Sequence, residues 1–168
     1  MDFRLSEEQE LLRASVADYL GKNYGHQQRL DALHRGNVML PGRWKECAEL
    51  GWLSMMFDEQ DGGLGFGPIE LMLVCEEFGR HLVLEPFLET VVLAGGLLRR
   101  AGSKQQKARY LDRLMAGDLQ AAFAYREPHH TGWIGEIETR LEARDDSPHR
   151  GLRVCWTGFG APVGSAAS

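Results

Sequence analysis

Histidines, cysteines and acidic pairs are the side chains of this sequence whose chemistry could define a site. His129 and His130 are adjacent, so on a strand they would point to opposite faces, and no third metal ligand stands at a suitable spacing. Cys47, Cys75 and Cys155 are widely spaced and form no CxxC pair. We therefore predict exposed or locally hydrogen-bonded histidines and reduced thiols, and no metal site.

Two further motifs have the composition of functional elements but the wrong spacing. Glu76 and Glu77 are adjacent, so on a helix their side chains point about 100° apart and cannot face each other as an acid–base pair. We expect one to be a solvated charge and the other to pair locally. The run "GGLGFG" would need a glycine at position 68 to complete GxGxxG, and that residue is Pro68. Proline is favoured in the first turn of a helix, so we interpret the run as a turn that leads into a helix.

Charge and hydropathy exclude several classes of protein. The 168 residues carry a net charge of −5, which argues against a general binder of nucleic acid or of anionic membranes. The first residues, "MDFRLSEEQELL", contain no apolar signal segment, and the longest apolar stretch, "VVLAGGLL", is too short to span a bilayer. We therefore expect a cytoplasmic protein. A basic cluster consists of Arg99, Arg100 and Lys104. We interpret it as complementing the dipole at a helix C-terminus, and a phosphate contact is the less favoured alternative.

Apolar periodicity predicts a mainly α fold that begins with a bundle of about five helices. Ser6 with Gln9, and Ser103 with Gln106, have the spacing of capping boxes and mark two helix starts. The expected helices cover residues 6–24, a segment from Gly42 to near Gly51, residues 68–80, residues 86–100 and a segment from Ser103 to Gly117.

Three features interrupt this helical pattern. Residues 25–40 are polar and irregular, which predicts a loop with room for one short helical turn. Gly95 and Gly96 fall inside the fourth helix, where each glycine costs about 0.5–1 kcal/mol relative to alanine. A close helix–helix crossing would explain why they are tolerated. Gly102 has the position of a C-cap.

The apolar pattern changes from about residue 119. "LQAAFAY" is continuously apolar and stops before Glu127 and Pro128, as a strand would, while "IGEIETRLEA" and "GLRVCW" alternate loosely. Roughly 50 residues remain, whereas a β-sandwich usually needs about 100. We therefore predict a helical domain over residues 1–117 and the truncated start of a β-domain over residues 118–168. These residue patterns by themselves reach no reaction.

Several motifs arrive in the order found in one known family. They are "LSEEQ", "AELGW", "GGLG", "EEFGR", "AGS", "AGD" and "EP". Over about residues 1–140 the chain resembles the N-terminal half of an acyl-CoA dehydrogenase. "PIELMLVCEEFGR" and "FAYREP" further resemble the small-subunit type, such as the small subunit of bacterial pimeloyl-CoA dehydrogenase.

The resemblance implies a fold and a mechanism. Members of the family have an N-terminal helical domain, a middle β-domain and a C-terminal helical domain, with FAD between the last two. A glutamate base from the C-terminal domain removes the α-proton of an acyl-CoA, and the β-hydrogen leaves as hydride to the flavin, which gives a trans-2-enoyl-CoA. The reduced flavin then passes electrons to an acceptor protein. No carboxylate of this sequence matches that base, so we expect the C-terminal helical domain to be absent and we name no catalytic residue.

The resemblance also places a cofactor contact at the end of the strand before Glu127. It implies that Ala124, Tyr125 and Arg126 lie near the flavin ring. The family usually has threonine where this sequence has Arg126, and "HHTGW" stands where a Gly-Ser-Asp motif is usual. Arg126 could therefore hydrogen-bond a flavin carbonyl or block the site.

Three hypotheses about function follow. The leading one is a fragment or small subunit of an FAD-dependent acyl-CoA dehydrogenase that is inactive alone. The alternative is a non-catalytic helical partner of a larger acyl-CoA dehydrogenase subunit, and the weakest is an unrelated helical-bundle binding protein. The expected partners are an acyl-CoA, a large subunit and an electron acceptor protein, without nucleic acid or a membrane span.

Overall fold

The computed structural model of the chain describes residues 4–37, 39–123, 140–143 and 152–155. The chain divides into two compact units, Met1–Phe123 and Ala124–Ser168. In the second unit, strand β1 (Arg140–Ala143) pairs antiparallel with strand β2 (Leu152–Cys155). These strands lie within the two loosely alternating segments from which strands are expected.

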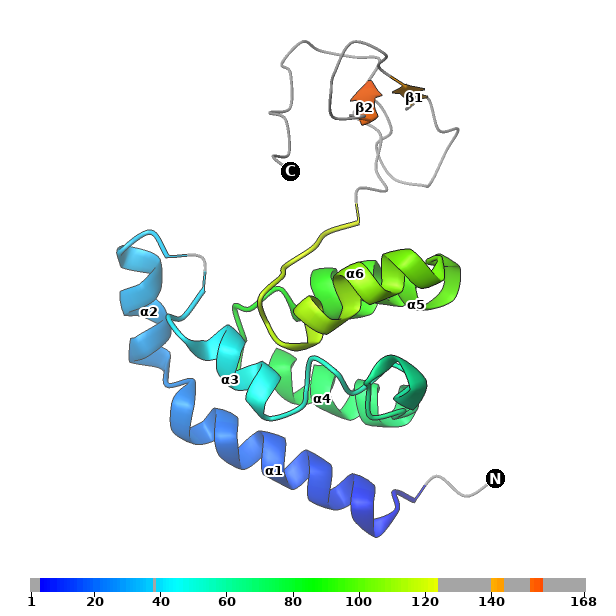
Figure 1. The fold of residues 1–168 in the computed structure, drawn as a ribbon. Coiled ribbons are helices and arrows are strands. Elements are labelled where there is room, and N and C mark those ends of the chain that lie inside the picture. Colours follow the sequence, from blue (N-terminus) through cyan, green and yellow to red (C-terminus); the bar gives the residue numbers. More distant parts are fainter. Residues whose placement is uncertain (1–3, 38, 124–139, 144–151, 156–168) are drawn as a thin grey trace. The chain divides into compact units, whose positions relative to one another are not determined.

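The first unit is helical, so the predicted mainly α fold is confirmed (Figure 1). Helix α1 lies along α4, where the Nε2 atom of Gln9 donates to Oε1 of Glu70 at 2.7 Å. A π-helix (η2) and a short helix, α5, pack against α6. The helices are α1 (Glu7–Asn23), α2 (His26–His34), α3 (Arg43–Glu49), the 3-10 turn η1 (Glu59–Asp61), α4 (Pro68–Arg80), η2 (Leu88–Gly95), α5 (Gly96–Ala101) and α6 (Lys104–Met115).

Both predicted capping boxes are present. The Ser6 hydroxyl accepts from the Gln9 amide at 3.2 Å, while the Gln9 side chain accepts from the Ser6 amide at 3.0 Å. Ser103 and Gln106 make the same two bonds at 3.2 and 2.9 Å. These pairs satisfy backbone donors that a helix start leaves free, which is why the two boundaries can be predicted from the sequence.

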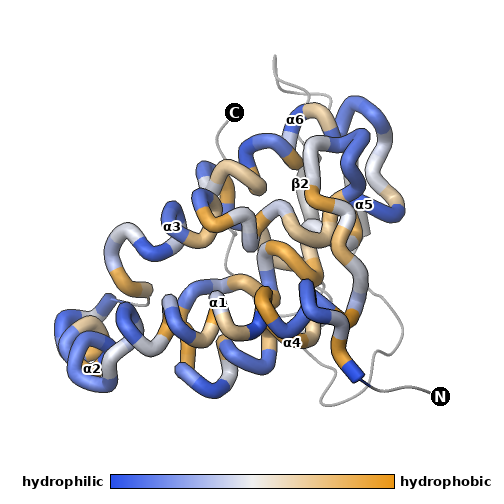
Figure 2. The backbone as a smooth tube through the Cα atoms, turned by 90° about the horizontal axis from the view of Figure 1, so that it is seen from below, coloured by the Kyte–Doolittle hydropathy of each residue, from blue (hydrophilic) through white to orange (hydrophobic). Residues whose placement is uncertain are grey.

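Two of three expectations about local structure are wrong. Residues 25–40 contain helix α2 instead of a loop. The sequence of α2 is largely polar (Figure 2) and only Ala32 is buried, so it has no apolar stripe from which a helix could be predicted. The single helix expected over residues 86–100 is present, and its first part is π-helical: η2 continues without a break into α5. The described residues 119–123 form no strand, because the side chain of Thr90, rather than a neighbouring strand, takes both backbone groups of Ala121.

The core of the first unit includes an apolar run that forms neither helix nor strand. In "WLSMMF", residues 52–57, the side chains of Leu53 and Phe57 are fully buried. Trp52 extends this core through edge-to-face contact with Phe78 at 5.2 Å between ring centroids, and Phe78 meets Phe87 at 5.0 Å. Such aromatic pairs contribute about 0.5–1.5 kcal/mol beyond their burial.

Candidate functional site

The glycine-rich loop is a structural turn, as predicted from Pro68. The backbone N–H groups of residues 63–66 all donate to carbonyl oxygens of residues 54–58, at 2.8–3.1 Å. The N–H of Gly67 donates to Oε2 of Glu70 at 2.9 Å, and Pro68 is the first residue of α4. A phosphate-binding loop needs free N–H groups that point at its ligand. Here those groups are engaged within the chain, so the loop is not built to hold a phosphate.

The adjacent glutamates of α4 do not form an acid–base pair. Glu77 is buried, while Glu76 accepts from the exposed Arg80 at 2.6 Å. Arg80 also lies 3.6 Å from the Glu77 carboxylate. The hydrogen bond from Arg80 lowers the pKa of Glu76. Because both carboxylates turn toward one arginine of the same helix, their arrangement serves local pairing.

Basic residues near α5 and α6 bind carboxylates of the η1 region. The Arg99 guanidinium donates twice to Oδ1 of Asp58, at 3.0 and 2.7 Å, and Lys107 donates to Asp61 at 2.8 Å. These bonds connect the glycine-rich segment to the helices that follow it in the sequence. Charge-assisted hydrogen bonds of this kind are stronger than neutral ones, especially where they are partly buried.

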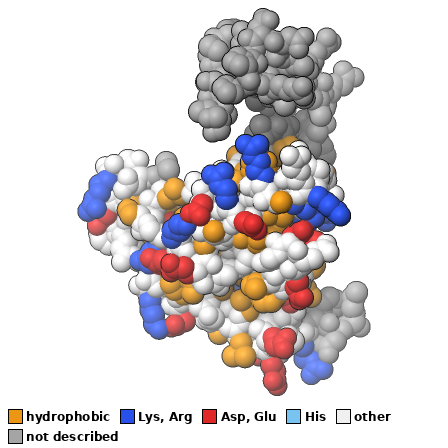
Figure 3. Space-filling view, in the orientation of Figure 1, with side chains coloured by type: hydrophobic (Ala, Val, Ile, Leu, Met, Phe, Trp, Pro, Cys, Tyr) orange, Lys and Arg blue, Asp and Glu red, His pale blue; other side chains and the backbone are white. Residues whose placement is uncertain are grey.

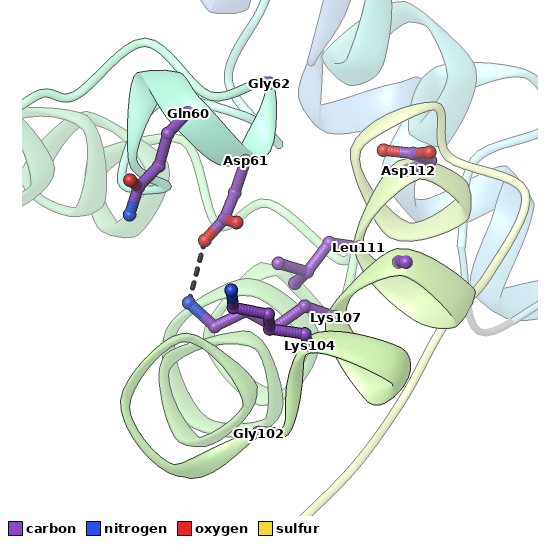
Figure 4. A pocket seen from close by; sticks show the side chains of 9 residues that line it. Gln60, Asp61, Gly62, Gly102, Lys104, Lys107, Leu111 and Asp112 are labelled. Atoms are coloured by element: carbon purple, nitrogen blue, oxygen red, sulfur yellow. Dashed lines mark hydrogen bonds and ion pairs between the residues drawn. The ribbon is translucent and has the colours of Figure 1, made fainter.

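A pocket of about 590 Å³ lies beside this connection (Figure 4). Lys107 is already neutralised by Asp61 inside the pocket, as the dashed line in Figure 4 marks. Lys104 and Asp112 then contribute charges of opposite sign to its lining. The pocket therefore favours neither an anionic nor a cationic ligand.

One carboxylate is buried in a hydrogen-bonded cluster that sequence reasoning missed. Glu85 accepts from the Leu40 amide at 3.1 Å and from the Tyr24 hydroxyl. Burial and this hydrogen bond raise the pKa of Tyr24. The phenol therefore stays protonated and serves as a donor that joins the end of α1 to the turn before η2.

A second buried polar contact connects η2 to the segment that leaves α6. The Thr90 hydroxyl is fully buried, donates to the carbonyl oxygen of Ala121 at 2.9 Å and accepts from the Ala121 amide at 3.3 Å. The available sequence signal was a lone threonine in a largely apolar stretch, "LETVVLAGG".

The residues predicted to contact a flavin, Ala124, Tyr125 and Arg126, lie outside the described residues, as do His129 and His130. Within the described part of the chain, no group of three or more histidine, cysteine, aspartate or glutamate side chains could hold a metal ion. The same part contains no helix that is both long and apolar enough to cross a membrane.

Together, these observations define a helical domain whose polar clusters hold its own segments in place. The sequence matches the family described as "Acyl-CoA dehydrogenase, N-terminal domain" over residues 6–118. The chain therefore belongs to the acyl-CoA dehydrogenase family, and the hypothesis of an unrelated helical binding protein is wrong. The finer similarity to pimeloyl-CoA dehydrogenase small subunits stays a prediction.

Relatives and solved structures agree with this family. The acyl-CoA dehydrogenase FadE12 of Mycobacterium tuberculosis is 36% identical over 126 residues, which cover 73% of this chain and 31% of that protein. Mitochondrial isovaleryl-CoA dehydrogenase of Pongo abelii is 34% identical over 144 residues, covering 83% of this chain and 34% of that protein. The chain thus spans about a third of the length of these curated relatives.

Two solved structures are similar in fold and sequence. The ChsE4–ChsE5 complex from Mycobacterium tuberculosis is 28% identical, with a TM-score of 0.69 over 92% of this chain and 40% of that one. The FAD complex of PigA is 25% identical, with a TM-score of 0.64 over 77% of this chain and 34% of that one.

Proposed function

We propose that this chain supplies the N-terminal helical domain, and the start of the middle β-domain, of an FAD-dependent acyl-CoA dehydrogenase. The reaction would be α,β-dehydrogenation of an acyl-CoA to a trans-2-enoyl-CoA, followed by electron transfer to an acceptor protein. The observation that carries the proposal is the family match over residues 6–118, which falls on the helical unit Met1–Phe123. A cytoplasmic location remains part of this proposal.

The proposed cofactor contacts are Ala124, Tyr125 and Arg126. When bound, FAD would accept the hydride, while the chain's own contribution would be to bind and orient the flavin ring through backbone groups and the Arg126 guanidinium. Similarity to the FAD complex of PigA supports FAD as the cofactor.

We further propose that these 168 residues have little or no dehydrogenase activity alone. The resemblance assigns proton abstraction to a glutamate base, and none of the 24 acidic residues of this sequence matches it. Without a base, removal of the α-proton would lose a contribution of about 10²–10⁴-fold or more. A larger acyl-CoA dehydrogenase subunit that carries the base is the partner we propose for this chain.

A second candidate function is a non-catalytic partner of a larger acyl-CoA dehydrogenase subunit. Large apolar side chains reach the surface of the helical unit between charges of both signs (Figure 3). Leu11 of α1 is 70% exposed, and Ile69 and Met72 of α4 are 47% and 55% exposed. Where such side chains form a contiguous apolar patch, the patch often belongs to a protein–protein interface. The similar ChsE4–ChsE5 structure is itself described as a complex, which supports a partner subunit.

Co-expression separates the two functions. The tagged chain is produced alone and together with an acyl-CoA dehydrogenase subunit that carries the glutamate base, and reduction of a dye by acyl-CoA is measured. We expect turnover only in the co-expressed complex, with FAD present in it, and an Arg126→Ala variant that binds less FAD. Turnover by the chain alone would contradict the need for a second subunit. A complex whose activity and FAD content do not change with Arg126→Ala would favour the non-catalytic role.

A further inference from the structure

The two oxygens of the Glu85 carboxylate accept hydrogen bonds from opposite ends of α2. Oε2 accepts from the hydroxyl of Tyr24, which precedes α2, and Oε1 accepts at 3.1 Å from the amide of Leu40, which follows it. All three residues are buried. Hydrogen bonds to a carboxylate are stronger than neutral ones. One side chain thus holds the chain in place on both sides of α2.

The helix between these two points has little stability of its own. It has nine residues, and isolated helices shorter than about 12–15 residues are marginal in water. Its N-cap, Gly25, offers no side chain to the amides of the first turn, whereas Ser6 and Ser103 cap α1 and α6. Ala32 is the one buried side chain of α2, so burial contributes little to keeping the helix formed.

Helix α2 also lies apart from the most extensive helix contacts. It stands at the edge of the helical unit in Figure 1 and again in Figure 2. In the described unit those contacts are made between α1 and α4 and among η1, η2, α5 and α6. The hydrogen bond between Gln27 and Asp31 of α2, at 2.8 Å, is exposed. Segments with few buried contacts open at a low free energy while the rest of a protein stays folded.

We infer that α2 opens and closes while the rest of the helical unit stays folded, and that Glu85 limits this opening by fixing both ends of α2. Opening of α2 breaks its own backbone hydrogen bonds and exposes Ala32, while both bonds of Glu85 stay in place. Release of Tyr24 or Leu40 is more costly, because it also breaks a bond to Glu85 and exposes a side chain of the apolar core. This inference does not depend on the proposed function.

Amide hydrogen exchange of the full chain, followed by NMR, tests the inference. In the original chain, hydrogen-bonded amides of α2 should exchange about tenfold or more faster than those at positions 24 and 40. Glu85→Gln and Tyr24→Phe weaken the bonds at the ends of α2, so exchange at positions 24 and 40 should rise about tenfold or more. Exchange within α2 should change by less than about twofold, because α2 opens without breaking those bonds.

The matched control is Glu77→Gln, since Glu77 is also buried but lies near Arg80 of its own helix. It should leave exchange at positions 24 and 40 within about twofold of the original. Amides of α2 that exchange as slowly as those two would overturn the inference, because α2 would then open only together with the core. Equal increases in α2 and at its ends in Glu85→Gln would overturn it too, and so would unchanged exchange at both ends.

Discussion

Phe57 occupies the space where a side chain on Gly95 would lie: a Cβ built on Gly95 would come within 2.6 Å of Cζ of Phe57. Gly63 lies equally close to the backbone of the same phenylalanine, since a Cβ on Gly63 would come within 2.1 Å of the Phe57 carbonyl oxygen. Two glycine-rich stretches that are distant in the sequence therefore make room for one fully buried residue. The close approach predicted at Gly95 exists, but its partner is a turn segment and not another helix.

Gly95→Ala should destabilise the chain while Gly96→Ala should not. Alanine at position 95 would overlap Phe57, and overpacking of a core costs about 1–3 kcal/mol. At Gly96 the nearest atom to a Cβ is Cε of Met56 at 3.5 Å, an ordinary contact, so alanine should add about 0.5–1 kcal/mol of helix stability. Urea unfolding of both variants measures the difference. Two variants of equal stability would contradict the packing of Phe57 against Gly95.

Local signals made some of the fold predictable. The capping boxes at Ser6 and Ser103 and the first turn at Pro68 depend on neighbours within three residues, and the structure contains all three. The close approach of Gly95 to Phe57 joins residues 38 positions apart in the sequence, and periodicity carries no such information. Tertiary contacts of this kind cannot be predicted from the local pattern.

The same reasoning applies to the candidate site. The pairing of Thr90 with Ala121 joins residues 31 positions apart, so no local motif could have identified it. The flavin contacts at Ala124, Tyr125 and Arg126 came from motif order in a family, and they stay a prediction. The exclusion of a phosphate loop at Pro68 came from spacing, and the backbone hydrogen bonds of the loop agree with it.

Tyr24→Phe should lower the free energy of unfolding by about 1–3 kcal/mol. The change leaves the buried Glu85 with the Leu40 amide as its remaining donor among the bonds described here, and an underbonded buried acceptor costs that much. Tyr110→Phe is the control, because the described contact of Tyr110 is with the Arg109 guanidinium over its ring, which phenylalanine keeps. We expect the control to change stability by less than about 0.5 kcal/mol. Equal losses in the two variants, measured by urea unfolding, would show that the Tyr24 hydroxyl contributes nothing specific.

Acid should destabilise the chain partly through Glu46. The hydrogen bond from Tyr19, followed by that from Arg43, lowers the pKa of Glu46 below its ordinary value of 4.5. The stabilisation is therefore complete above the ordinary pKa and is lost as the pH falls through the lowered pKa of the folded state. Between about pH 7 and pH 3, the stability of Glu46→Gln should fall less than that of the original chain.

The control for Glu46 is Glu49→Gln on the same helix, an exposed residue. It should follow the original chain across the whole pH range. The measurement is the urea midpoint at a series of pH values, and the expected sign is specific: Glu46→Gln begins less stable at neutral pH and converges with the original chain in acid. Parallel curves for the original chain and Glu46→Gln would mean that Glu46 has the same pKa folded and unfolded.

Cys47 should resist alkylation in the folded chain more strongly than Cys75. Burial raises the pKa of the Cys47 thiol to about 12, and that of Cys75 is raised by a lesser degree of burial. The thiolate is the reactive form, so both factors slow the reaction of Cys47 with iodoacetamide near pH 8. Two chains that keep one of these cysteines, with alanine at the other and at Cys155, isolate each rate. Denaturation in urea should make the alkylation rates of the two cysteines equal, because their difference comes from folding. Equal alkylation rates in the folded chain would contradict the prediction. They would mean that the face of α3 with Cys47 opens to solvent as readily as the flank of α4 with Cys75.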